Sequence, residues 1–586
     1  MIKFNQNGTG NYVVLVGGEV VFNSTEAKAI EFAVNSGGSA RISHDYDLTV
    51  TQDARPSIPA PFNIPPFSIL WGLDVQKDDK ISYRNTTARD GGGEGRVKLD
   101  NWGVPEITGP AGYHQVYFSI NDGPDLVAFV GHADDKAIEA QFYIPVQENN
   151  RSVLKPSSDS NVVFLSDGED VVAAVRQMRV DFPDYVLLER GGTYKPTESI
   201  WPVSGRAGEP SVIGAFGEGE RPHINPQHDR DGMRIWSGRH DIAIMGLKLL
   251  PTWRDPDHPD FAGFGNHVRP GILGYSGDGG TQHGPFLLED MEIGYFSDNI
   301  DFTGTSTSRI VLRYSDIHHA YSETGHSQGL FSWLNETLVE YTVFDHNGWL
   351  KVMDGRTKAE GGAVIHNHSI YLSNGRRSIL RHNISARPSS SVCKLAANPK
   401  TAEQERLEHL SFEIMQYGNI GIYGETGWGG GGNNDFGEST RFDKIHAFDN
   451  LNYMQGQLQQ TDRTLGWGDA AIDWNDSFSA GGIYVRSDNP EVRNIYGLHI
   501  KGHQSRNVYS RNRFYGESDG KAIVDQGNGT YQLIDNTEDP EKVVRIEAFM
   551  SSMGEPDTSV ENFIQLSREF KPGFDAPHLM AFMKRQ

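Results

Sequence analysis

Histidine is concentrated in one short stretch of the chain. Seven of its 21 histidines lie between positions 318 and 382, namely His318, His319, His326, His346, His366, His368 and His382. Imidazole titrates near neutral pH and is therefore well suited to proton transfer. The group as a whole predicts a catalytic or binding site, although any single histidine is more often a structural turn residue.

The stretch that holds the histidines also repeats. Four blocks share an apolar pair, polar residues, one apolar residue (Ile293, Ile317, Val343 or Ile384) and further polar residues. They are LLEDMEIGYF (287–296), VLRYSDIHHA (311–320), LVEYTVFDHN (338–347) and ILRHNISARP (379–388). A second set follows the first: DNIDFTG (298–304), SQGLFSW (327–333), HSIYLSN (368–374), VCKLAAN (392–398) and GNIGIYG (418–424). Two strands per repeat predict a solenoid whose coils bury their inner faces by stacking.

This alignment gives the polar residues a geometry. His319 and His346 occupy equivalent positions of adjacent coils, so their rings should stack about one strand spacing apart, ~4.8 Å. Tyr371 and Lys394 fall at equivalent outward positions, because a lysine is poorly tolerated in a solenoid core. His326 and a second histidine, His368, lie at the entrance of a second-set strand.

One segment resembles a known superfamily. GTYKPTESIWPVSGRAGEPSVIGAFGEGERPHIN (192–225) is similar to the opening coils of pectate-lyase-like right-handed parallel β-helix proteins. VFDHNGW (343–349), IHNHSIYLSNGRRSILRHNISAR (365–387) and the C-terminal tail are similar to bacterial and phage members. The resemblance covers about residues 160–570. It implies the fold, whereas lyases, hydrolases, epimerases and tailspikes all share that fold.

We therefore expect an all-β chain in three parts. Residues 1–155 show alternating segments between turn signals and predict a β-sandwich-like domain. Residues 156–530 predict the right-handed parallel β-helix, opened by a helix with a Ser166–Glu169 capping box. Residues 531–586 predict a short helical segment, with N-terminal signals at Asp539 and at Thr558.

The residue types on one face suit β-elimination on a uronate polysaccharide. That reaction needs a base, a cation that neutralises the carboxylate, and an acid for the leaving oxygen. We expect His346 or His368 as the base and Tyr371 as the partner acid. Lys394 or Arg356 would neutralise the carboxylate.

Further side chains beside this group predict substrate contacts. The insert at 349–362 contributes Trp349, which could stack on a sugar ring, and three cations, Lys351, Arg356 and Lys358. Inserts on one flank of a solenoid commonly carry the binding site. The expected substrate-binding residues are His319, His326, Trp349, Lys351, Arg356 and Arg387.

Two alternatives remain open. Asp298, Asp301 and Asp345 could supply the paired carboxylates of a glycoside hydrolase. A non-catalytic tailspike or adhesin would bind surface glycan without cleaving it, and we would expect such a chain to be a homotrimer. Asn383 is expected to be a structural ladder residue.

Composition narrows the partners and the compartment. The net charge of −24 disfavours a nucleic-acid partner, and no apolar run is long enough to predict a membrane span. The single cysteine, Cys393, allows no intramolecular disulfide, and the first residues show no signal peptide. We expect an extracellular or virion location. No cofactor is predicted. Acidic turns suit calcium, but the histidine spacings match no zinc motif, so the metal is left unassigned.

Overall fold

The computed structural model describes the chain most fully from residue 156 onward. The described ranges there are 156–206, 209–227, 229–264, 269–275, 284–303, 310–322, 325–333, 337–350, 360–363, 366–373, 378–396, 414–425, 427, 442–443, 445–458, 466–472, 474–475, 477–489, 495–516 and 522–586. Before them, it describes residues 152 and 154 and ten strands.

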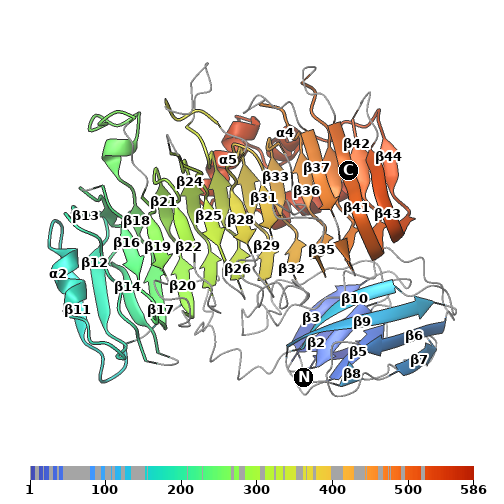
Figure 1. Ribbon diagram of the computed structural model, residues 1–586, viewed down its shortest axis with the longest axis horizontal. Coiled ribbons are helices and arrows are strands. Elements are labelled where there is room, and N and C mark those ends of the chain that lie inside the picture. The colour runs from blue at the N-terminus through green and yellow to red at the C-terminus, as the bar shows by residue number, and fades with distance from the viewer. Residues whose placement is uncertain are drawn as a thin grey trace.

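Three parallel sheets wind along one axis and form a parallel β-helix (Figure 1). The first sheet is built from β11 (Val162–Leu165), β12 (Tyr185–Glu189), β14 (Ser211–Phe216), β17 (Ile242–Met245), β20 (Phe286–Glu289), β23 (Ile310–Arg313), β26 (Thr337–Glu340), β29 (Ser378–Arg381), β32 (Ile414–Tyr417), β35 (Ile445–Phe448), β39 (Phe478–Ala480) and β41 (Ile495–Ser510), joined by β34 (Phe442–Asp443), β37 (Gly466–Ile472), β38 (Trp474–Asn475) and β43 (Ile523–Ile534).

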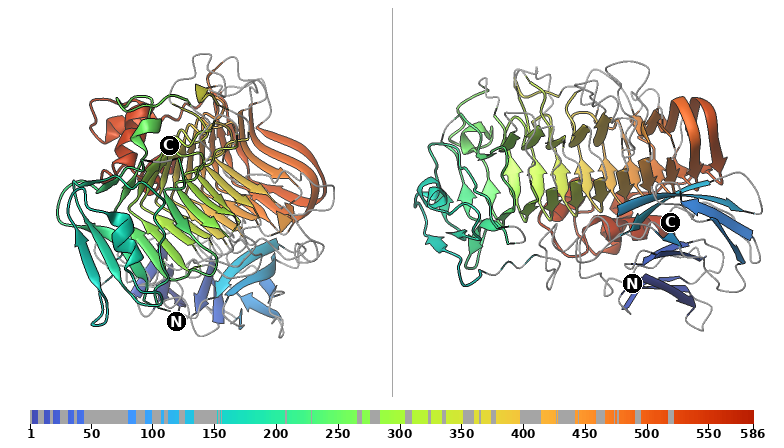
Figure 2. Two further views of the ribbon diagram at one scale, coloured as in Figure 1. Left: turned by 60° about the vertical axis from the view of Figure 1, so that its left-hand side comes forward. Right: turned by 60° about the horizontal axis from the view of Figure 1, so that its bottom comes forward.

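The second sheet follows the first within each coil. It contains β13 (Thr193–Tyr194), β15 (His223–Ile224), β18 (Lys248–Leu249), β21 (Glu292–Gly294), β24 (Asp316–His318), β27 (Val343–Asp345), β30 (Ile384–Ala386), β33 (Ile420–Ile422), β36 (Leu451–Tyr453), β40 (Ile483–Val485), β42 (Arg513–Tyr515) and β44 (Thr537–Asp539). The third sheet contains β16 (Met233–Ile235), β19 (Ile272–Tyr275), β22 (Ile300–Thr303), β25 (Leu330–Ser332), β28 (Ile370–Ser373) and β31 (Cys393–Ala396). Figure 2 shows the stacked coils from two further directions.

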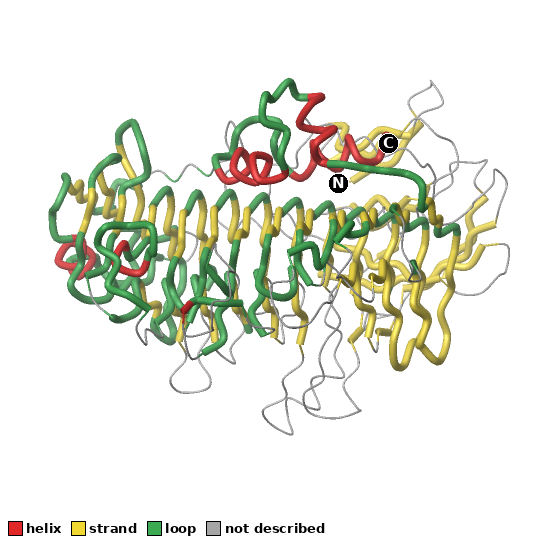
Figure 3. Tube along the Cα trace, turned by 90° about the horizontal axis from the view of Figure 1, so that it is seen from above, coloured by secondary structure: helices red, strands yellow, loops and turns green. Residues whose placement is uncertain are grey.

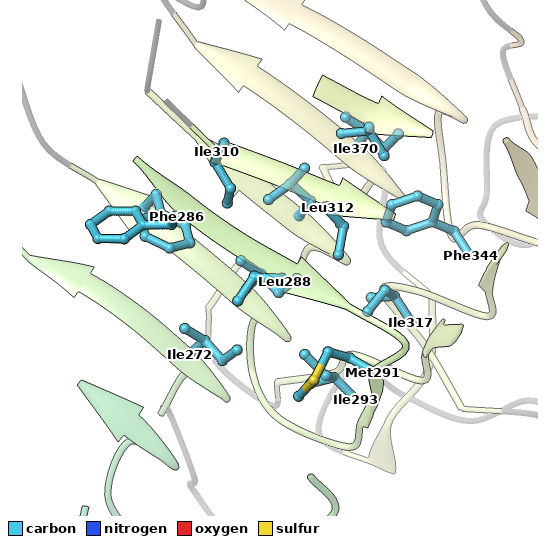
Figure 4. Packing of buried hydrophobic residues seen from close by; sticks show 14 of the residues in the cluster. Ile272, Phe286, Leu288, Met291, Ile293, Ile310, Leu312, Ile317, Phe344 and Ile370 are labelled. Carbon is cyan, nitrogen blue, oxygen red and sulfur yellow. The ribbon is translucent and has the colours of Figure 1, made fainter. Parts of the chain in front are cut away.

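The core lies between the three sheets and consists of inward rows of aliphatic residues. Leu288, Leu312, Val339 and Leu380 pair in successive coils of the first sheet and are fully buried. Ile293 pairs with Ile317 in the second sheet in the same way. Figure 4 shows Leu288, Leu312, Ile293 and Ile317 meeting inside the coil. Each coil supplies one layer of the core, so stacking provides the burial that an isolated coil lacks.

The turns between sheets also repeat. Tyr295, His319, His346 and Arg387 each end a second-sheet strand with a positive φ, between 46° and 63°. Left-handed backbone at four aligned non-glycine residues shows that each coil turns in the same way. Asn383 is confirmed as a ladder residue, because its backbone N–H donates to Asn419 Oδ1 at 3.0 Å.

The sequence blocks combine strands differently from our expectation. Each first-set block spans two strands, so a full coil has three strands rather than two. Phe344, rather than Val343, pairs with Ile317, and the segment at 418–424 pairs with β30 of the second sheet rather than with β31 of the third. Val343 and Ile384 therefore face outward, which an apolar pattern alone cannot distinguish.

The outward apolar residues of the second sheet are covered by the C-terminal helices. These are α4 (Ile546–Ser552), α5 (Val560–Arg568) and α6 (Ala576–Arg585), which pack in one cluster with Val343 and Ile384. Figure 3 shows them along one side of the coil. The predicted helical segment is confirmed, although α5 is capped by Ser559 rather than by Thr558 and α4 has Arg545 at its N-cap.

The opening helix is shorter than the capping box suggested. Helix α2 (Val171–Arg176) is capped by Asp170, which accepts from two backbone N–H groups. Ser166 N still donates to Glu169 Oε2 at 2.6 Å, just before the helix. A short 3-10 turn, η5 (Thr252–Arg254), is the remaining helical element of this part. Across the described residues, no helix is long and apolar enough to cross a membrane.

Among the described residues, the N-terminal region contributes antiparallel strands. They are β1 (Ile2–Gln6), β2 (Tyr12–Val16), β3 (Glu19–Ser24), β4 (Glu31–Asn35), β5 (Ser39–Ser43), β6 (Lys80–Asn85), β7 (Glu94–Lys98), β8 (Ile107–Thr108), β9 (Gly112–Ile120) and β10 (Leu126–His132). They form three small sheets. The β character is as expected, whereas the sandwich packing stays a prediction.

Candidate active site

The outer face of the third sheet carries one continuous row of side chains. Arg234, Leu273, Asp301, Phe331, Tyr371 and Lys394 pair in successive coils. All six are half-buried, and their strand neighbours point into the core. Because side chains alternate along a strand, the six must share the outer face. Five strand spacings give the row a length of about 24 Å.

One end of this row brings three predicted catalytic residues together. The Lys394 ammonium nitrogen lies 4.9 Å from the centre of the Tyr371 ring. The His368 ring packs edge-on against the Tyr371 ring, with 5.6 Å between centroids. The outward register of Tyr371 and Lys394 expected from the sequence is confirmed.

His368 is held in a defined state by its surroundings. It is 3% exposed, and the backbone N–H of Ser391 donates to its Nδ1 at 3.3 Å. Burial, together with the positive charge of Lys394, holds the pKa of His368 well below its usual value. The ring is therefore neutral at neutral pH, with its proton on Nε2. That nitrogen is buried and has no hydrogen-bond partner among the described residues.

Two carboxylates lie next to the row, two coils away from Tyr371. Asp301 belongs to the row itself, and Asp298 precedes the same strand. The backbone N–H of Gln328 donates to Asp298 Oδ1 at 2.8 Å. Burial and the negative charge of Asp301 raise the pKa of Asp298 well above its usual value. A carboxyl that keeps its proton to higher pH than usual, next to a second carboxyl, is a combination used for acid–base catalysis.

The predicted subsite residue His326 lies on the same face but outside the row. Its exposed ring packs against the ring of His366, with 5.2 Å between centroids. The position equivalent to His368 in the preceding coil is held by Gln328, whose Oε1 accepts from His368 N at 2.6 Å. His326 is thus accessible to a ligand from solvent, as a subsite requires.

The second histidine pair lies on the second sheet and is closed off. The rings of His319 and His346 stack with 4.9 Å between centroids, as the repeat alignment predicted. However, the two residues are only 7% and 4% exposed. Burial holds the pKa of His319 well below its usual value and lowers the pKa of His346.

Ion pairs next to these two histidines join the second sheet to the C-terminal segment. Arg387 holds both carboxylate oxygens of Asp345, at 2.9 and 2.7 Å. From α5, Arg568 reaches Asp345 Oδ2 at 3.3 Å and both oxygens of Asp316 at 3.1 and 3.0 Å. Burial alone would raise the pKa of Asp345, but Arg387 and its other cationic neighbours bring that pKa well below its usual value.

The remaining predicted residues of this group are also closed off. Trp349 is buried, packs against the His346 ring with 5.0 Å between centroids, and donates to Arg387 O at 2.6 Å. A sugar cannot reach its indole face in this arrangement. His346 as base and Trp349 and Arg387 as open subsites are therefore not supported by the geometry. Lys351 and Arg356 lie outside the described residues.

One group of possible metal ligands also lies under α5. Single ligand atoms of Glu292, Asp316 and His318 fall within 4.8 Å of one another. The Lys248 ammonium, however, lies 2.9 Å from Glu292 Oε1, and Arg568 occupies both oxygens of Asp316. Cationic side chains already neutralise these carboxylates, so the donor set does not favour a metal ion.

Two features of the face were missed by the sequence analysis. Phe331 stacks on Tyr371 with 4.8 Å between ring centroids, and the aligned blocks SQGLFSW and HSIYLSN already placed the two rings together. The role of Arg568 had no comparable signal, because 252 residues separate it from Asp316.

Comparisons with known proteins add distant likenesses. No family model and no curated protein matches the sequence. A mannuronic acid specific polysaccharide family 6 lyase from human gut microbiota is 12% identical, with a TM-score of 0.38, covering 73% of this chain and 100% of that one. The A-module of an Azotobacter vinelandii mannuronan C-5 epimerase is 13% identical, with a TM-score of 0.36, covering 64% and 97%.

A lacto-N-biosidase from Eubacterium ramulus is 11% identical, with a TM-score of 0.36, covering 65% of this chain and 68% of that one. At these values the likenesses carry no argument about the reaction. The parallel β-helix itself, which the sequence resemblance led us to expect, is shown by the three stacked sheets of this chain.

Proposed function

We propose that the protein cleaves an acidic, uronate-containing polysaccharide laid along the outer face of the third sheet, by β-elimination at Tyr371. The observation that carries this proposal is the juxtaposition of His368, Tyr371 and Lys394 on one face. A phenol that acts first as base and then as acid, and an ammonium group that neutralises the carboxylate, supply the functions that elimination requires, while the imidazole positions the phenol. The substrate would be an extracellular or capsular glycan.

The hydrogen bond to His368 refines the expected roles. Because Nδ1 accepts from Ser391 N, the proton of the neutral ring sits on Nε2, which suits donation rather than proton removal. Because that nitrogen is buried in the folded chain, we assign to His368 the positioning of the Tyr371 ring. The base role then passes to Tyr371, whose ring centre lies 4.9 Å from the Lys394 ammonium nitrogen.

The proposed step balances as a simple elimination. The Tyr371 phenolate removes the proton from the ring carbon that bears the carboxylate. The electron pair of that C–H bond forms the new double bond, and the neighbouring C–O bond to the next sugar breaks. The leaving oxygen takes a proton from the phenol, which returns Tyr371 to its starting state. Lys394 stabilises the negative charge that develops on the carboxylate.

A second candidate is hydrolysis by Asp298 and Asp301. The specific observation in its favour is the raised pKa of Asp298 next to a second carboxyl, that of Asp301. A protonated carboxyl can protonate the leaving oxygen while the second carboxylate activates water or attacks the sugar. Tyr371 and Asp301 belong to the same row, so either reaction would use the same bound polymer.

The deciding experiment measures two products in parallel. Purified protein is incubated with a panel of acidic polysaccharides, with and without calcium, and unsaturated uronate is followed by its ultraviolet absorbance while reducing ends are counted. We expect both signals to rise together. Tyr371→Phe should lower the rate at least ~100-fold, the usual scale of one general acid–base group. Tyr531→Phe, in β43 of the first sheet, is the matched control and should retain activity.

The other outcomes separate the candidates. New reducing ends without absorbance would reject elimination and move the reaction to Asp298 and Asp301. Binding without any new ends would reject both reactions and favour a glycan-binding adhesin, for which we would then expect a homotrimer. Activity that survives in Tyr371→Phe would remove that residue from the mechanism.

A further inference from the structure

A cavity of about 450 Å³ lies at the N-terminal end of the coil, away from Tyr371. Such a volume falls in the range of small-molecule binding sites. Its lining comes from α2, from the segment before β14, and from the third sheet and the turns that lead into it. The lining residues are Arg176, Glu198, Ser199, Trp201, Arg230, Asp231, Arg234 and Arg269.

The cavity is electropositive, although the chain as a whole carries a net charge of −24. Four arginines line it, against two carboxylates. Arg176 pairs with Glu198 at 2.7 Å, and Arg234 Nε donates to Asp231 at 2.6 Å. Within the described part of the chain, Arg230 and Arg269 form no ion pair. Two guanidinium groups therefore remain to bind an anion, and a planar guanidinium matches a carboxylate or a sulfate well.

Two exposed tryptophans stand beside these arginines. Trp201 and Trp236 are 43% and 40% exposed, and their rings stack with 5.8 Å between centroids. The Arg234 guanidinium lies 5.5 Å from the centre of the Trp201 ring. Large exposed aromatic surface of this kind marks an interaction site. An indole face next to free cations suits a pyranose ring that carries a negative group.

The cavity is continuous with the row of the proposed active site. Ile200 pairs with Met233, which places Trp201 beside Arg234 at the start of that row. Arg234 and Tyr371 are four coils apart, about 19 Å at the usual strand spacing. A polymer that crosses Tyr371 along this face would therefore reach the cavity, whereas a short oligosaccharide would not.

We propose that this cavity is a distal subsite that binds an anionic sugar of the polysaccharide through Arg230, Arg269 and the Trp201 indole. The inference rests on the proposed function for the identity of the polymer, but the binding itself does not need cleavage. The recognised chemistry is a negative group on a sugar ring, either a uronate carboxylate or a sulfate ester.

The test measures binding by calorimetry on the full chain. The probes are oligouronates long enough to span the row, sulfated oligosaccharides of equal length, and neutral glucan oligosaccharides. The Tyr371→Phe chain is used beside the unmodified one, so that turnover does not disturb the titration. We expect anionic probes to bind and neutral ones to bind at least tenfold more weakly. The stronger of the two anionic probes identifies the source of the charge.

Variants then locate the binding. Arg230→Ala combined with Arg269→Ala should weaken binding of the anionic probe by about tenfold or more. Trp201→Ala should also weaken its binding, without changing the charge of the cavity. Arg585→Ala, an exposed cation at the end of α6, is the matched control and should bind as before. All these positions are exposed, so folding should be retained, which circular dichroism would verify.

The two proposals fail in different ways. Equal binding by the Arg230/Arg269 variant and the parent would overturn the distal subsite, even if cleavage is normal. Binding that the variant loses, in a protein that cleaves nothing, would uphold the subsite and reject the proposed reaction. If both hold, the variant should raise KM for long substrates and leave kcat for short ones unchanged.

Discussion

The imidazole rings of His319 and His346 stack 4.9 Å apart beneath helix α5, on a face of the coil that no polymer can reach in this arrangement. Their function is therefore structural in the folded chain. Both rings are kept neutral by burial, while the adjacent Asp345 is kept ionised by Arg387 and other cations. This combination ties the docking of the C-terminal helices to the protonation of two histidines.

Acidification should therefore destabilise the protein through this pair. An unfolded histidine has a pKa near 6.5, and the folded pKa of both residues is lower. Their stabilisation is complete above 6.5 and is lost as the pH falls below that value toward the folded pKa, because the unfolded chain binds more protons. Each unit of depression corresponds to about 1.4 kcal/mol.

The measurement is the melting temperature at pH 7.5 and pH 5. His319→Asn combined with His346→Asn should lose at least ~1 kcal/mol less stability between these values than the parent does. Asparagine is chosen because it tolerates the positive φ of both positions. His326→Asn, which is exposed, is the control. The same pH dependence in both chains would show that the stack does not couple to docking.

Arg568 should be required for the docking of α5. It is the one residue of this helix for which ion pairs with the coil are seen in the described structure, and it faces Asp316 and Asp345. Removing Arg568 leaves the buried Asp316 carboxylate without its ion pair, which costs about 3–5 kcal/mol, whereas Asp345 keeps Arg387. We expect Arg568→Ala to lower the melting temperature and to speed hydrogen exchange in Val560–Arg568, whereas Arg585→Ala should do neither. Unchanged exchange in α5 would mean that the apolar contacts hold it alone.

The repeat alignment predicted neighbours across coils because stacking is a local, periodic property. His319 with His346 and Tyr371 with Lys394 both followed from counting within aligned blocks. Side chains at equivalent positions of adjacent coils must lie one strand spacing apart, whatever the rest of the chain does. The fold and the Tyr371 end of the candidate site were therefore accessible from the sequence.

The accessibility of those neighbours did not follow, because it depends on contacts between distant segments. His346 and Trp349 were expected on an open face, but both are buried. Helix α5 packs against β27, next to His346, from 223 positions further along the chain. A signal existed in Val343 and Ile384, whose apolar side chains face outward and need a cover. The repeat pattern alone read them as inward, since it does not distinguish a core from a covered outer face.

The raised pKa of Asp298 should give a pH dependence of the opposite sign. A carboxyl whose folded pKa lies above its unfolded value of 3.8 destabilises the protein as the pH rises through that interval, because the folded state must release a proton that it holds more tightly. Asp298→Asn removes this effect. The variant should gain melting temperature relative to the parent at pH 8, and the difference should shrink at pH 4.

Asp298→Asn also tests whether the protein is a hydrolase. If Asp298 is the general acid of a hydrolase, Asp298→Asn should abolish new reducing ends, whereas an enzyme that eliminates at Tyr371 should keep its activity in this variant. The matched control is Asp290→Asn. The Asp290 carboxylate is half-buried, lies away from the third sheet, and pairs with Arg221 at 2.8 Å. A melting temperature of Asp298→Asn that follows the parent at every pH would show that folding does not raise the pKa of Asp298.

Asn383 should be among the residues on which the coil depends most. Its Oδ1 accepts from Thr342 N at 3.0 Å, and its Nδ2 donates to Val339 O at 2.9 Å, all inside the buried turn. Asn383→Ala leaves a backbone donor and a backbone acceptor without partners, at about 1–3 kcal/mol each. We expect a loss of roughly 3 kcal/mol in urea unfolding, against a few tenths for Asn528→Ala, an exposed asparagine of β43. Similar losses in both variants would mean that water enters the turn and replaces the missing amide. The hydrogen bonds of the asparagine ladder would then add little to the free energy of unfolding.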